Sequence, residues 1–394
     1  MEESIMLEAA QINKMAEKLM PRLQAWRRDF HKHPELSRQE KRTSAKIAEI
    51  LRGLGLRVQT GVGGFGVVGL LPGPRGGRTV AVRADMDALP VTETNAVPYK
   101  SSTVGVMHAC GHDAHITMAL GAATILSKQK LPGTVKFIFQ PAEESVDGAA
   151  AMIKDGVMDN PKVDAIFALH VKPDLEFGAV ALRDGLSMAA NTVFNIQVSG
   201  HGGHGARPDL AVDPLPAAHQ IYAALQTVRR GLSPLSPCVL SVCAFNGGSA
   251  FNIIPETVDM LGTLRTTDEA VYKQVISDIR GLVRNIAAAY RVRATVSFPF
   301  RTAAVNNAPA QAALLRQAAA DLRIPVRTID MLMVSEDFAF FQQEAPGVLA
   351  WLGTKRGKKV HRLHAPDFDF DEAILPRGAA LLALCAQNQL QASR

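Results

Sequence analysis

The first part of the chain carries hydrophobic residues at helical spacing. These residues lie three or four positions apart: Ile12, Met15, Leu19, Leu23, Trp26 and Phe30. Pro34 ends this predicted helix. Ser37 and Glu40 have the spacing of a capping box and predict a second helix. Gly53 and Gly55 are expected to close that second helix.

Short stretches of uninterrupted hydrophobic residues follow, and their length is typical of buried strands. They cover residues 67–71, 79–83, 134–139 and 165–169. Helices are predicted between some of them, at residues 114–127 and 149–153. Buried strands that alternate with helices predict an α/β sheet covered by helices on both faces.

The pattern changes near residue 190, where hydrophobic and polar residues alternate as in a strand with one solvated face. The expected elements are then a helix at 217–228, strands at 239–245 and 257–265, a helix from 267, and a strand at 294–298. This β-α-β-β-α-β order resembles a ferredoxin-like sandwich. Residues after about 300 return to α/β character, with a strand at 348–352 and a final helix after Pro376.

These patterns predict one α/β domain interrupted by a smaller inserted α+β domain. We expect the first part of the α/β domain at residues 1–188, the insertion at 189–300, and the second part at 301–394. A length of 394 residues suits two or three domains.

Composition and charge exclude several classes of protein. The chain is 47% hydrophobic and 20% charged, which is typical of a folded protein and excludes bulk disorder. No apolar run is long enough for a membrane-spanning helix, so no membrane partner is expected. The net charge of +6 is not clustered, so no nucleic acid partner is expected. Four cysteines in a chain of this length, without a secretory signal, predict a cytoplasmic protein.

A glycine-rich segment at residues 61–66 matches the G-x-G-x-x-G pattern of dinucleotide-binding sites. Such a site needs a strand before the glycines and a helix after them. Here the predicted strand at 67–71 follows instead. We therefore predict a glycine-rich turn and no dinucleotide cofactor.

The strongest chemical signal is the segment Met-His-Ala-Cys-Gly-His-Asp-Ala-His at residues 107–115. Thiolate and imidazole groups are ligands of zinc and neighbouring metals. The segment opens a predicted helix, so we expect Asp113 to cap the helix and Cys110 and His112 to lie in the preceding loop. Taken alone, this cluster is about equally compatible with a metal site and with a capped helix start.

Further metal-ligand types follow other predicted strands. Asp85 and Asp87 come after the strand at 79–83, the Glu143–Glu144 pair after 134–139, and His170 after 165–169. His361 and His364 lie in a loop near the C-terminus. Each has an ordinary structural explanation, but ligands of open α/β sheets gather at the carboxyl ends of strands. Together these residues favour a metal site.

The adjacent carboxylates Glu143 and Glu144 suggest a division of roles. One can bind metal while the other stays free as a general base for a metal-held water. Two metals about 4 Å apart can share that water and polarise a carbonyl. This arrangement implies hydrolysis without naming the bond.

Seven motifs occur in order along nearly the whole chain. They are His-x-His-Pro-Glu-Leu-Ser (31–37), Arg-Ala-Asp-Met-Asp-Ala-Leu-Pro (83–90), the segment at 107–115, Gln-Pro-Ala-Glu-Glu (140–144), Gly-Gly-His-Gly-Ala (202–206), Ser-Glu-Asp-Phe (335–338) and Leu-His-Ala-Pro-Asp-Phe (363–368). Together they resemble the amidohydrolase branch of the aminoacylase/carboxypeptidase di-metal peptidase family, which includes hippurate hydrolases, N-acyl-amino-acid amidohydrolases and auxin-conjugate hydrolases.

The resemblance implies a role for each residue. Glu143 is implied to be the general base, and Asp87 the carboxylate that orients a metal ligand. In some relatives a histidine ligand stands at the position of Asp85, so the resemblance leaves open whether Asp85 touches metal. The implied ligands of two divalent metal ions, zinc or manganese with nickel or cobalt as alternatives, are Cys110, His112, Glu144, His170 and His364.

The inserted domain is implied to be a lid and dimerisation domain that makes a homodimer or homotetramer. His204 would stabilise the oxyanion, from the partner subunit. Asn252 and Arg265 would hold the substrate carboxylate. An ordinary structural explanation accounts for them equally well, a strand-end turn for Asn252 and an exposed strand cation for Arg265. The chain departs from the pattern of the branch at Ser145, Asp209 and Val334.

The implied reaction is hydrolysis of the amide bond of N-acyl-amino acids into a carboxylic acid and a free amino acid. A dipeptidase or carboxypeptidase acting on short peptides with the same two metals is the first alternative. A non-catalytic metal-binding dimer is the second alternative. The intact Glu143–Glu144 pair argues against it.

Overall fold

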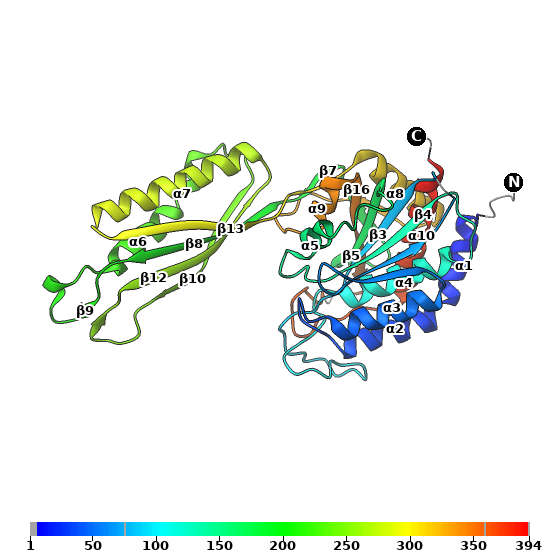
Figure 1. The fold of residues 1–394 in the computed structure, drawn as a ribbon, viewed down its shortest axis with the longest axis horizontal. Helices are drawn as coiled ribbons and strands as arrows, with labels where there is room; N and C mark the ends of the chain where they lie inside the picture. Colours follow the sequence, from blue (N-terminus) through cyan, green and yellow to red (C-terminus); the bar gives the residue numbers. More distant parts are fainter. Residues whose placement is uncertain (1–5, 75, 358–359, 393–394) are drawn as a thin grey trace. The chain divides into compact units, whose positions relative to one another are not determined.

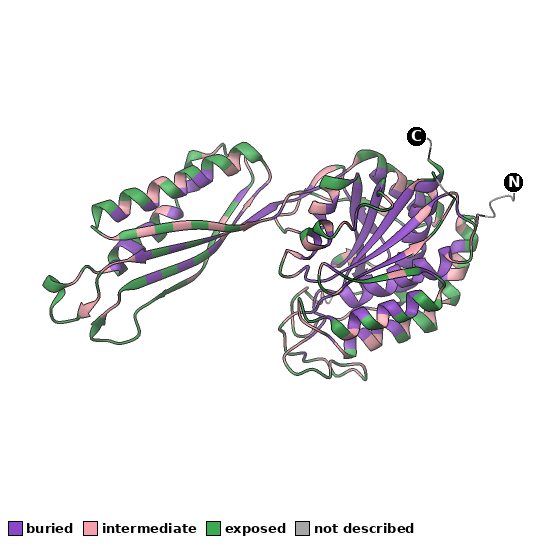
Figure 2. Cartoon of the chain, in the orientation of Figure 1, coloured by how far each residue is buried: buried purple, intermediate pink, exposed green. Residues whose placement is uncertain are grey.

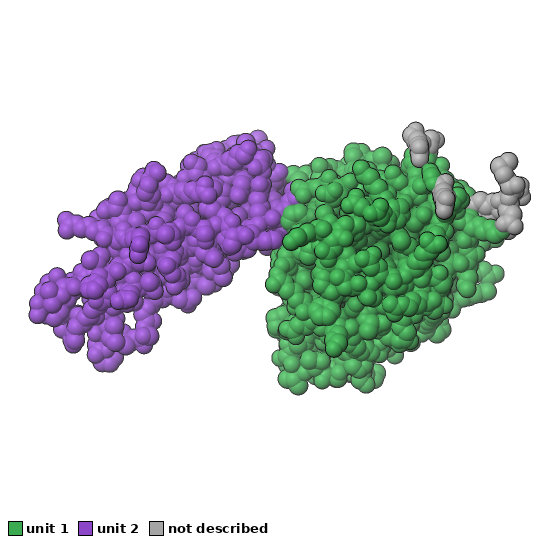
Figure 3. All heavy atoms as spheres, in the orientation of Figure 1, with its two compact units in different colours: residues 1–187, 305–330, 336–394 green, residues 188–304, 331–335 purple. Residues whose placement is uncertain are grey.

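The computed structural model of the chain describes residues 6–74, 76–357 and 360–392. Its residues divide into two compact units (Figure 3). The large unit comprises Met1–Ser187, Val305–Asp330 and Glu336–Arg394, and the small unit comprises Met188–Ala304 and Met331–Ser335. Each unit has its own hydrophobic core, and each is considered separately below.

Within the described residues, the large unit is built on an eight-stranded mixed sheet in the order β1-β2-β4-β3-β5-β16-β6-β15 (Figure 1). The pairs β3–β4, β3–β5 and β5–β16 are parallel, whereas β1–β2 and β2–β4 are antiparallel. The strands are β1 (Arg57–Val62), β2 (Gly66–Leu71), β3 (Thr79–Asp85), β4 (Thr134–Gln140), β5 (Ala165–Glu176), β6 (Val180–Leu182), β15 (Val326–Thr328) and β16 (Gly347–Lys355).

Helices cover this sheet, as the α/β prediction expects. Helices α4 and α10 pack against each other and against β3 and β5, while α5 and α9 pack on β4 and β16. Every residue of α4 is buried, which identifies it as a central core helix (Figure 2). The helices are α1 (Ala9–Lys18), α2 (Met20–Lys32), α3 (Lys41–Gly53), α4 (His112–Leu126), α5 (Gly148–Lys154), α8 (Pro309–Asp321), α9 (Phe338–Glu344) and α10 (Leu375–Gln391).

The N-terminal helix predicted as one element is in fact two, α1 and α2, which meet at Leu19. Pro21 lies in the first turn of α2 and has no amide hydrogen, so the helical hydrogen bonds cannot continue through it. The predicted capping box was also wrong. The hydroxyl of Ser37 donates to Asp87 Oδ2 instead, and α3 begins only after Glu40.

Three details near the metal-ligand motifs also differ from the prediction. His112 does not lie in the loop before α4, because it is the first residue of that helix. Asp113 does not cap α4, because Gly111 is the N-cap and Asp113 pairs with the buried Arg27 at 2.8 Å. His170 does not follow a strand, because β5 continues to Glu176 by pairing with β16. The predicted strand ended too early because polar residues of β5 continue the hydrogen-bonded pairing with β16.

The glycine-rich segment at 61–66 is the turn of the β1–β2 hairpin, as predicted. The remaining short elements of the described chain are β7 (Gly185–Met188), β14 (Val305–Asn307), β9 (Gly203–His204) and β11 (Ile253–Ile254), with 3₁₀ helices at Pro208–Leu210, Val228–Gly231 and Glu372–Ile374.

In the part of the chain that is described, the small unit has the predicted β-α-β-β-α-β order. Its elements are β8 (Ala190–Ser199), α6 (Pro214–Leu225), β10 (Cys238–Gly247), β12 (Thr257–Thr266), α7 (Glu269–Ala289) and β13 (Arg293–Arg301). The antiparallel sheet has the order β10-β12-β8-β13. Buried Phe194, Ile196 and Val198 alternate with more exposed residues, so α6 and α7 cover one face. This is a ferredoxin-like arrangement.

None of the described helices combines the length and the hydrophobicity that a membrane span requires.

Candidate metal centre

The candidate ligands gather at one edge of the large sheet. Strands β3 and β4 are parallel and end at Asp85 and Gln140, and the Glu143–Glu144 pair follows β4 directly. In the β3–β5 register Arg83 lies opposite Ala168, so Asp85 is level with His170. Thus His170, although inside its strand, lies where the neighbouring strands end. Carboxyl ends of strands are the usual ligand sites of open α/β sheets.

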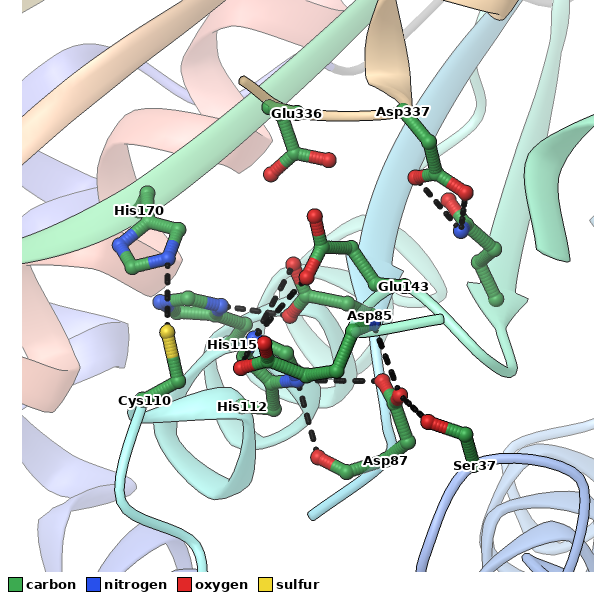
Figure 4. Close-up of polar contacts among 12 residues, drawn as sticks. Ser37, Asp85, Asp87, Cys110, His112, His115, Glu143, His170, Glu336 and Asp337 are labelled. Atoms are coloured by element: carbon green, nitrogen blue, oxygen red, sulfur yellow. Dashed lines mark hydrogen bonds and ion pairs between the residues drawn. The ribbon is translucent and has the colours of Figure 1, made fainter. Parts of the chain in front are cut away.

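The first group of ligand atoms belongs to Cys110, His112 and His170. Their sulfur and nitrogen atoms lie within 4.8 Å of one another, and all three residues are buried. Cys110 Sγ is 3.5 Å from His170 Nε2 (Figure 4). One thiolate and two imidazoles are suitable ligands for a first-row divalent metal.

The second group consists of Cys110, Glu144 and His364, whose ligand atoms also lie within 4.8 Å of one another. His364 Nε2 is 3.4 Å from Glu144 Oε1. The neighbouring Cys110 and Glu144 side chains raise the pKa of His364 to about 10. The structure therefore brings all five predicted ligands into two groups that share Cys110, whereas His361 belongs to neither group.

Buried polar atoms without partners test whether these residues fit a metal. His112 Nε2 and Glu144 Oε1 are buried, and neither has a hydrogen-bond partner among the described residues. The other nitrogen of His112, Nδ1, donates to the carbonyl oxygen of Asp87 at 2.9 Å. The ring therefore turns Nε2 toward the acidic residues. A buried polar atom without a partner is costly, and a bound cation would satisfy such atoms.

Asp87 contacts two of the candidate ligands, His112 and Glu144. Its Oδ2 accepts from the hydroxyl of Ser37 at 2.6 Å and from the backbone amide of Glu144 at 3.0 Å. Its Oδ1 lies 3.3 Å from His112 Nδ1. Asp87 thus fixes one candidate ligand by its ring and another by its backbone, which suits the orienting role that the resemblance implies.

Glu143 lies beside the ligands and belongs to neither of these two three-residue groups. Its Oε2 is 3.9 Å from His112 Nε2, and its carboxylate faces Glu336 (Figure 4). Burial, together with the carboxylates of Glu336 and Glu144, raises the pKa of Glu143 well above its usual range. A raised pKa makes a carboxylate a stronger proton acceptor, as a general base requires.

Arg83 is a buried residue near the site, and no role was assigned to it from the sequence. Its guanidinium donates to Asp85 at 2.7 Å, to Glu336 at 2.8 Å and to Gln140 at 2.7 Å. The Ser-Glu-Asp-Phe motif is thereby joined to the ends of β3 and β4. The available signal was the spacing of Arg83 and Asp85, which places both side chains on one face of a strand.

His115 was also missed, although it lies three residues after His112 on α4. Its Nδ1 is 2.6 Å from Asp85 Oδ1, and its Nε2 accepts from the amide of Val171 at 3.0 Å. Burial opposes ionisation of Asp85, but His112, His115 and Arg83 hold its pKa well below the usual range. Both oxygens of Asp85 are thus engaged by protein groups.

The remaining predicted residues lie in the small unit. His204 on β9 pairs with Ile253 of β11, so it lies next to Asn252, and both are exposed. The amide of Ala206 donates to His204 Nδ1 at 3.0 Å, which leaves the hydrogen on Nε2. Arg265 donates to the Ser335 hydroxyl at 3.1 Å.

The structure does not bring Arg265 to His204 and Asn252 within one small unit. Arg265 lies near the far end of β12, roughly 26 Å along the strand from Thr257 at a rise of ~3.3 Å per residue. Asp209, one of the departures from the resemblance, is exposed and pairs with Arg207 at 2.8 Å.

Comparison with known proteins agrees with this geometry. Residues 81–388 match peptidase family M20/M25/M40. A thermostable carboxypeptidase of Saccharolobus solfataricus is 40% identical over 92% of this chain and 95% of its own. An N-acetyl-L-cysteine deacetylase of Bacillus subtilis is 37% identical over 93% of this chain and 88% of its own.

A solved Bacillus subtilis structure, described as a dinuclear metal-binding peptidase from the M20 family, has a TM-score of 0.82. It shares 34% identity, over 96% of this chain and 99% of that one. The fold, the paired groups of ligand atoms and these relatives lead to one conclusion: the chain belongs to peptidase family M20/M25/M40 and is a metal-dependent hydrolase.

Proposed function

We propose that this chain hydrolyses the amide bond of N-acyl-amino acids and releases a carboxylic acid and a free amino acid. The observation that carries this proposal is the position of Glu143, a buried carboxylate beside two groups of ligand atoms that do not include it. The relative described as an N-acetyl-L-cysteine deacetylase supports an acyl-amino acid as substrate.

Cys110, His112 and His170 would hold one divalent cation, and Cys110, Glu144 and His364 the other. Such cations supply Lewis-acid polarisation of the amide carbonyl and activation of water. Thiolate and imidazole ligands favour zinc, and carboxylate and imidazole also suit manganese, nickel or cobalt.

The residues of the chain then handle the protons and the developing charge. Glu143 takes a proton from the attacking water and passes it to the leaving amine nitrogen, while Asp87 keeps His112 and Glu144 in place. His204 would donate its Nε2 hydrogen to the tetrahedral oxyanion, from a partner subunit. Arg265 and Asn252 would bind the substrate carboxylate.

We further propose that the small unit acts as a lid and assembles the chain into a homodimer or homotetramer. A second subunit would supply what one chain cannot, because His204 and Arg265 lie far apart within one small unit. We also propose a cytoplasmic location, which the four free cysteines support.

The test compares two adjacent substitutions. Glu143→Gln should keep both metals and substrate binding but lower kcat by two to four orders of magnitude, in line with the ~10²–10⁴-fold worth of general-base catalysis. Glu144→Gln should instead lose metal, measured by elemental analysis after dialysis. Near-normal turnover in Glu143→Gln, with zinc or manganese restored, would remove Glu143 from the base role.

A carboxypeptidase or dipeptidase acting on short peptides remains a second candidate, because a 40% identical relative is described as a thermostable carboxypeptidase. The two functions differ in whether a free α-amino group is accepted next to the scissile bond. Turnover of an N-acetyl-amino acid and of the corresponding dipeptide, at equal concentration, separates them. Faster turnover of the dipeptide would favour the second candidate.

A further inference from the structure

The hydrogen bonds of His115 fix which of its ring nitrogens carries the hydrogen. The amide of Val171 donates to Nε2 at 3.0 Å. A backbone N–H can only donate, so Nε2 must be the unprotonated nitrogen. The hydrogen is therefore on Nδ1 and points at Asp85 Oδ1, 2.6 Å away.

Asp85 is held in turn by a group that can only donate. Arg83 Nη1 donates to Asp85 Oδ2 at 2.7 Å, and Arg83 is anchored by Glu336 and Gln140. The donor and the acceptor of each hydrogen bond in this buried network are therefore fixed. Arg83 and His115 both donate to Asp85, and the amide of Val171 donates to His115.

This hydrogen-bond network ends at Val171, whose backbone orients the candidate ligand His170. His170 Nδ1 donates to the carbonyl oxygen of Val171 at 2.8 Å, and its Nε2 lies 3.5 Å from Cys110 Sγ. Val171 thus contacts His115 through its N–H and His170 through its carbonyl. The rings of His115 and His170 are 4.5 Å apart between centroids, so His115 leaves His170 little room to turn.

We propose that Asp85 and His115 are positioning residues that fix His170 for metal binding, with Asp85 selecting the His115 tautomer that accepts the Val171 amide. In this proposal neither residue is a ligand: both nitrogens of His115 are engaged, and each oxygen of Asp85 accepts a hydrogen bond from a neighbouring side chain. The inference rests on the metal set proposed above and adds the residues that hold it.

The substitution Asp85→Asn has a defined consequence. Arg83 has no acceptor, so the amide oxygen of the asparagine must face Arg83, and its NH₂ group must face His115 Nδ1. Nδ1 then has to accept, which moves the histidine hydrogen to Nε2, against the N–H of Val171. The loss of one negative charge near the metals is a separate effect.

The substitution His115→Gln separates these two effects. The glutamine amide oxygen can take the place of Nε2 and accept from Val171 whatever stands at position 85. In this background Asp85→Asn removes the same charge but has no histidine tautomer to change. Thr124→Val is a matched control, because Thr124 is buried on the same helix and its hydroxyl donates to the carbonyl oxygen of Leu120.

The experiment is a double-mutant cycle on zinc affinity, measured on the full chain by competition with a chromophoric chelator. Loss of a group that orients a ligand typically lowers metal affinity ~10–100-fold, which we expect for Asp85→Asn alone. In the His115→Gln background we expect Asp85→Asn to lower zinc affinity by a factor that is at least about ten times smaller than in the native background. Thr124→Val should leave the affinity unchanged.

Equal fold-losses for Asp85→Asn in both backgrounds would overturn the proposal, since they would reflect charge alone. The ¹⁵N shifts of the His115 ring give a second measurement that needs no substitution at position 115. The native protein should carry hydrogen on Nδ1 and Asp85→Asn on Nε2. An Nε2–H tautomer in the native protein would overturn the proposal even if a variant fails to fold.

The readouts do not involve turnover, so the two proposals can fail separately. Intact coupling in a protein that hydrolyses no acyl-amino acid would refute the proposed substrate and support the positioning role. Normal hydrolysis without coupling would refute the positioning role alone.

Discussion

Replacing Gly111 with alanine should destabilise the large unit through two separate costs. Gly111 is the N-cap of α4 and has a φ of +93°, a left-handed conformation that costs a residue with a side chain ~1–2 kcal/mol. A Cβ atom there would also lie 2.4 Å from Val171 Cγ2, inside contact distance. Overpacking of this kind costs ~1–3 kcal/mol, so the expected loss is about 2–5 kcal/mol in total.

Gly64→Ala is the matched control for the first cost. Gly64 has a φ of +99° in the β1–β2 turn, and a Cβ atom there would meet nothing within 4 Å. Only the backbone term applies, so the expected loss is ~1–2 kcal/mol. The difference between the two variants isolates the collision with Val171.

Urea unfolding followed by tryptophan fluorescence measures both losses. The chain has two tryptophans, Trp26 and Trp351, and both belong to the large unit, so the signal reports on that unit. Gly111→Ala should also weaken zinc binding, because Val171 adjoins His170. Losses for the two variants that agree within ~0.5 kcal/mol would refute the collision argument.

Three further predictions concern other buried groups. Arg27→Leu should lower the free energy of unfolding by ~3–5 kcal/mol in urea, since it leaves Asp113 buried without the guanidinium 2.8 Å away, and a loss below ~1 kcal/mol would contradict this. Burial raises the pKa of Glu40 from 4.5 to about 7, so the folded state binds more protons than the unfolded state between these pH values, and the free energy of unfolding should fall by ~3 kcal/mol as the pH rises through them. Glu40→Gln should lose that dependence, and an unchanged pH profile of urea unfolding would exclude Glu40 as its source. Added Zn²⁺ should protect Cys110 from iodoacetamide, whereas exposed Cys243 should react with or without metal. Peptide mass spectrometry measures the labelling of both cysteines. Equal labelling of Cys110 with and without Zn²⁺ would count against Cys110 as a ligand.

The hydrophobic pattern predicted the fold well where burial alone decides the structure. Strands β3 and β4 begin at the predicted residues because their side chains are buried on both faces. The prediction cut strand β5 short because polar residues occur in it from His170 onward, where pairing with β16 continues the strand. A pairing between strands so distant in sequence leaves no local signal.

The same limit applies to the candidate site. Residues of ligand type were visible in the sequence, and the structure groups five of them. The residues that hold them were not visible, because their partners are distant, as in Arg83 and Glu336, 253 positions apart. Ser37 was assigned to a helix cap from its local spacing, but its hydroxyl is used by Asp87. Local sequence patterns therefore identify the candidate metal ligands more readily than the residues that hold these ligands in place.

The sharing of Cys110 between the two groups of ligand atoms makes the candidate ligands unequal. Substitution of His170 takes an atom from one group only, and substitution of His364 takes an atom from the other only. Substitution of Cys110 takes the same sulfur from both, so one thiol governs the occupancy of two positions. Variants at the histidines would therefore divide the centre into halves, while a variant at the cysteine would dismantle it as a whole.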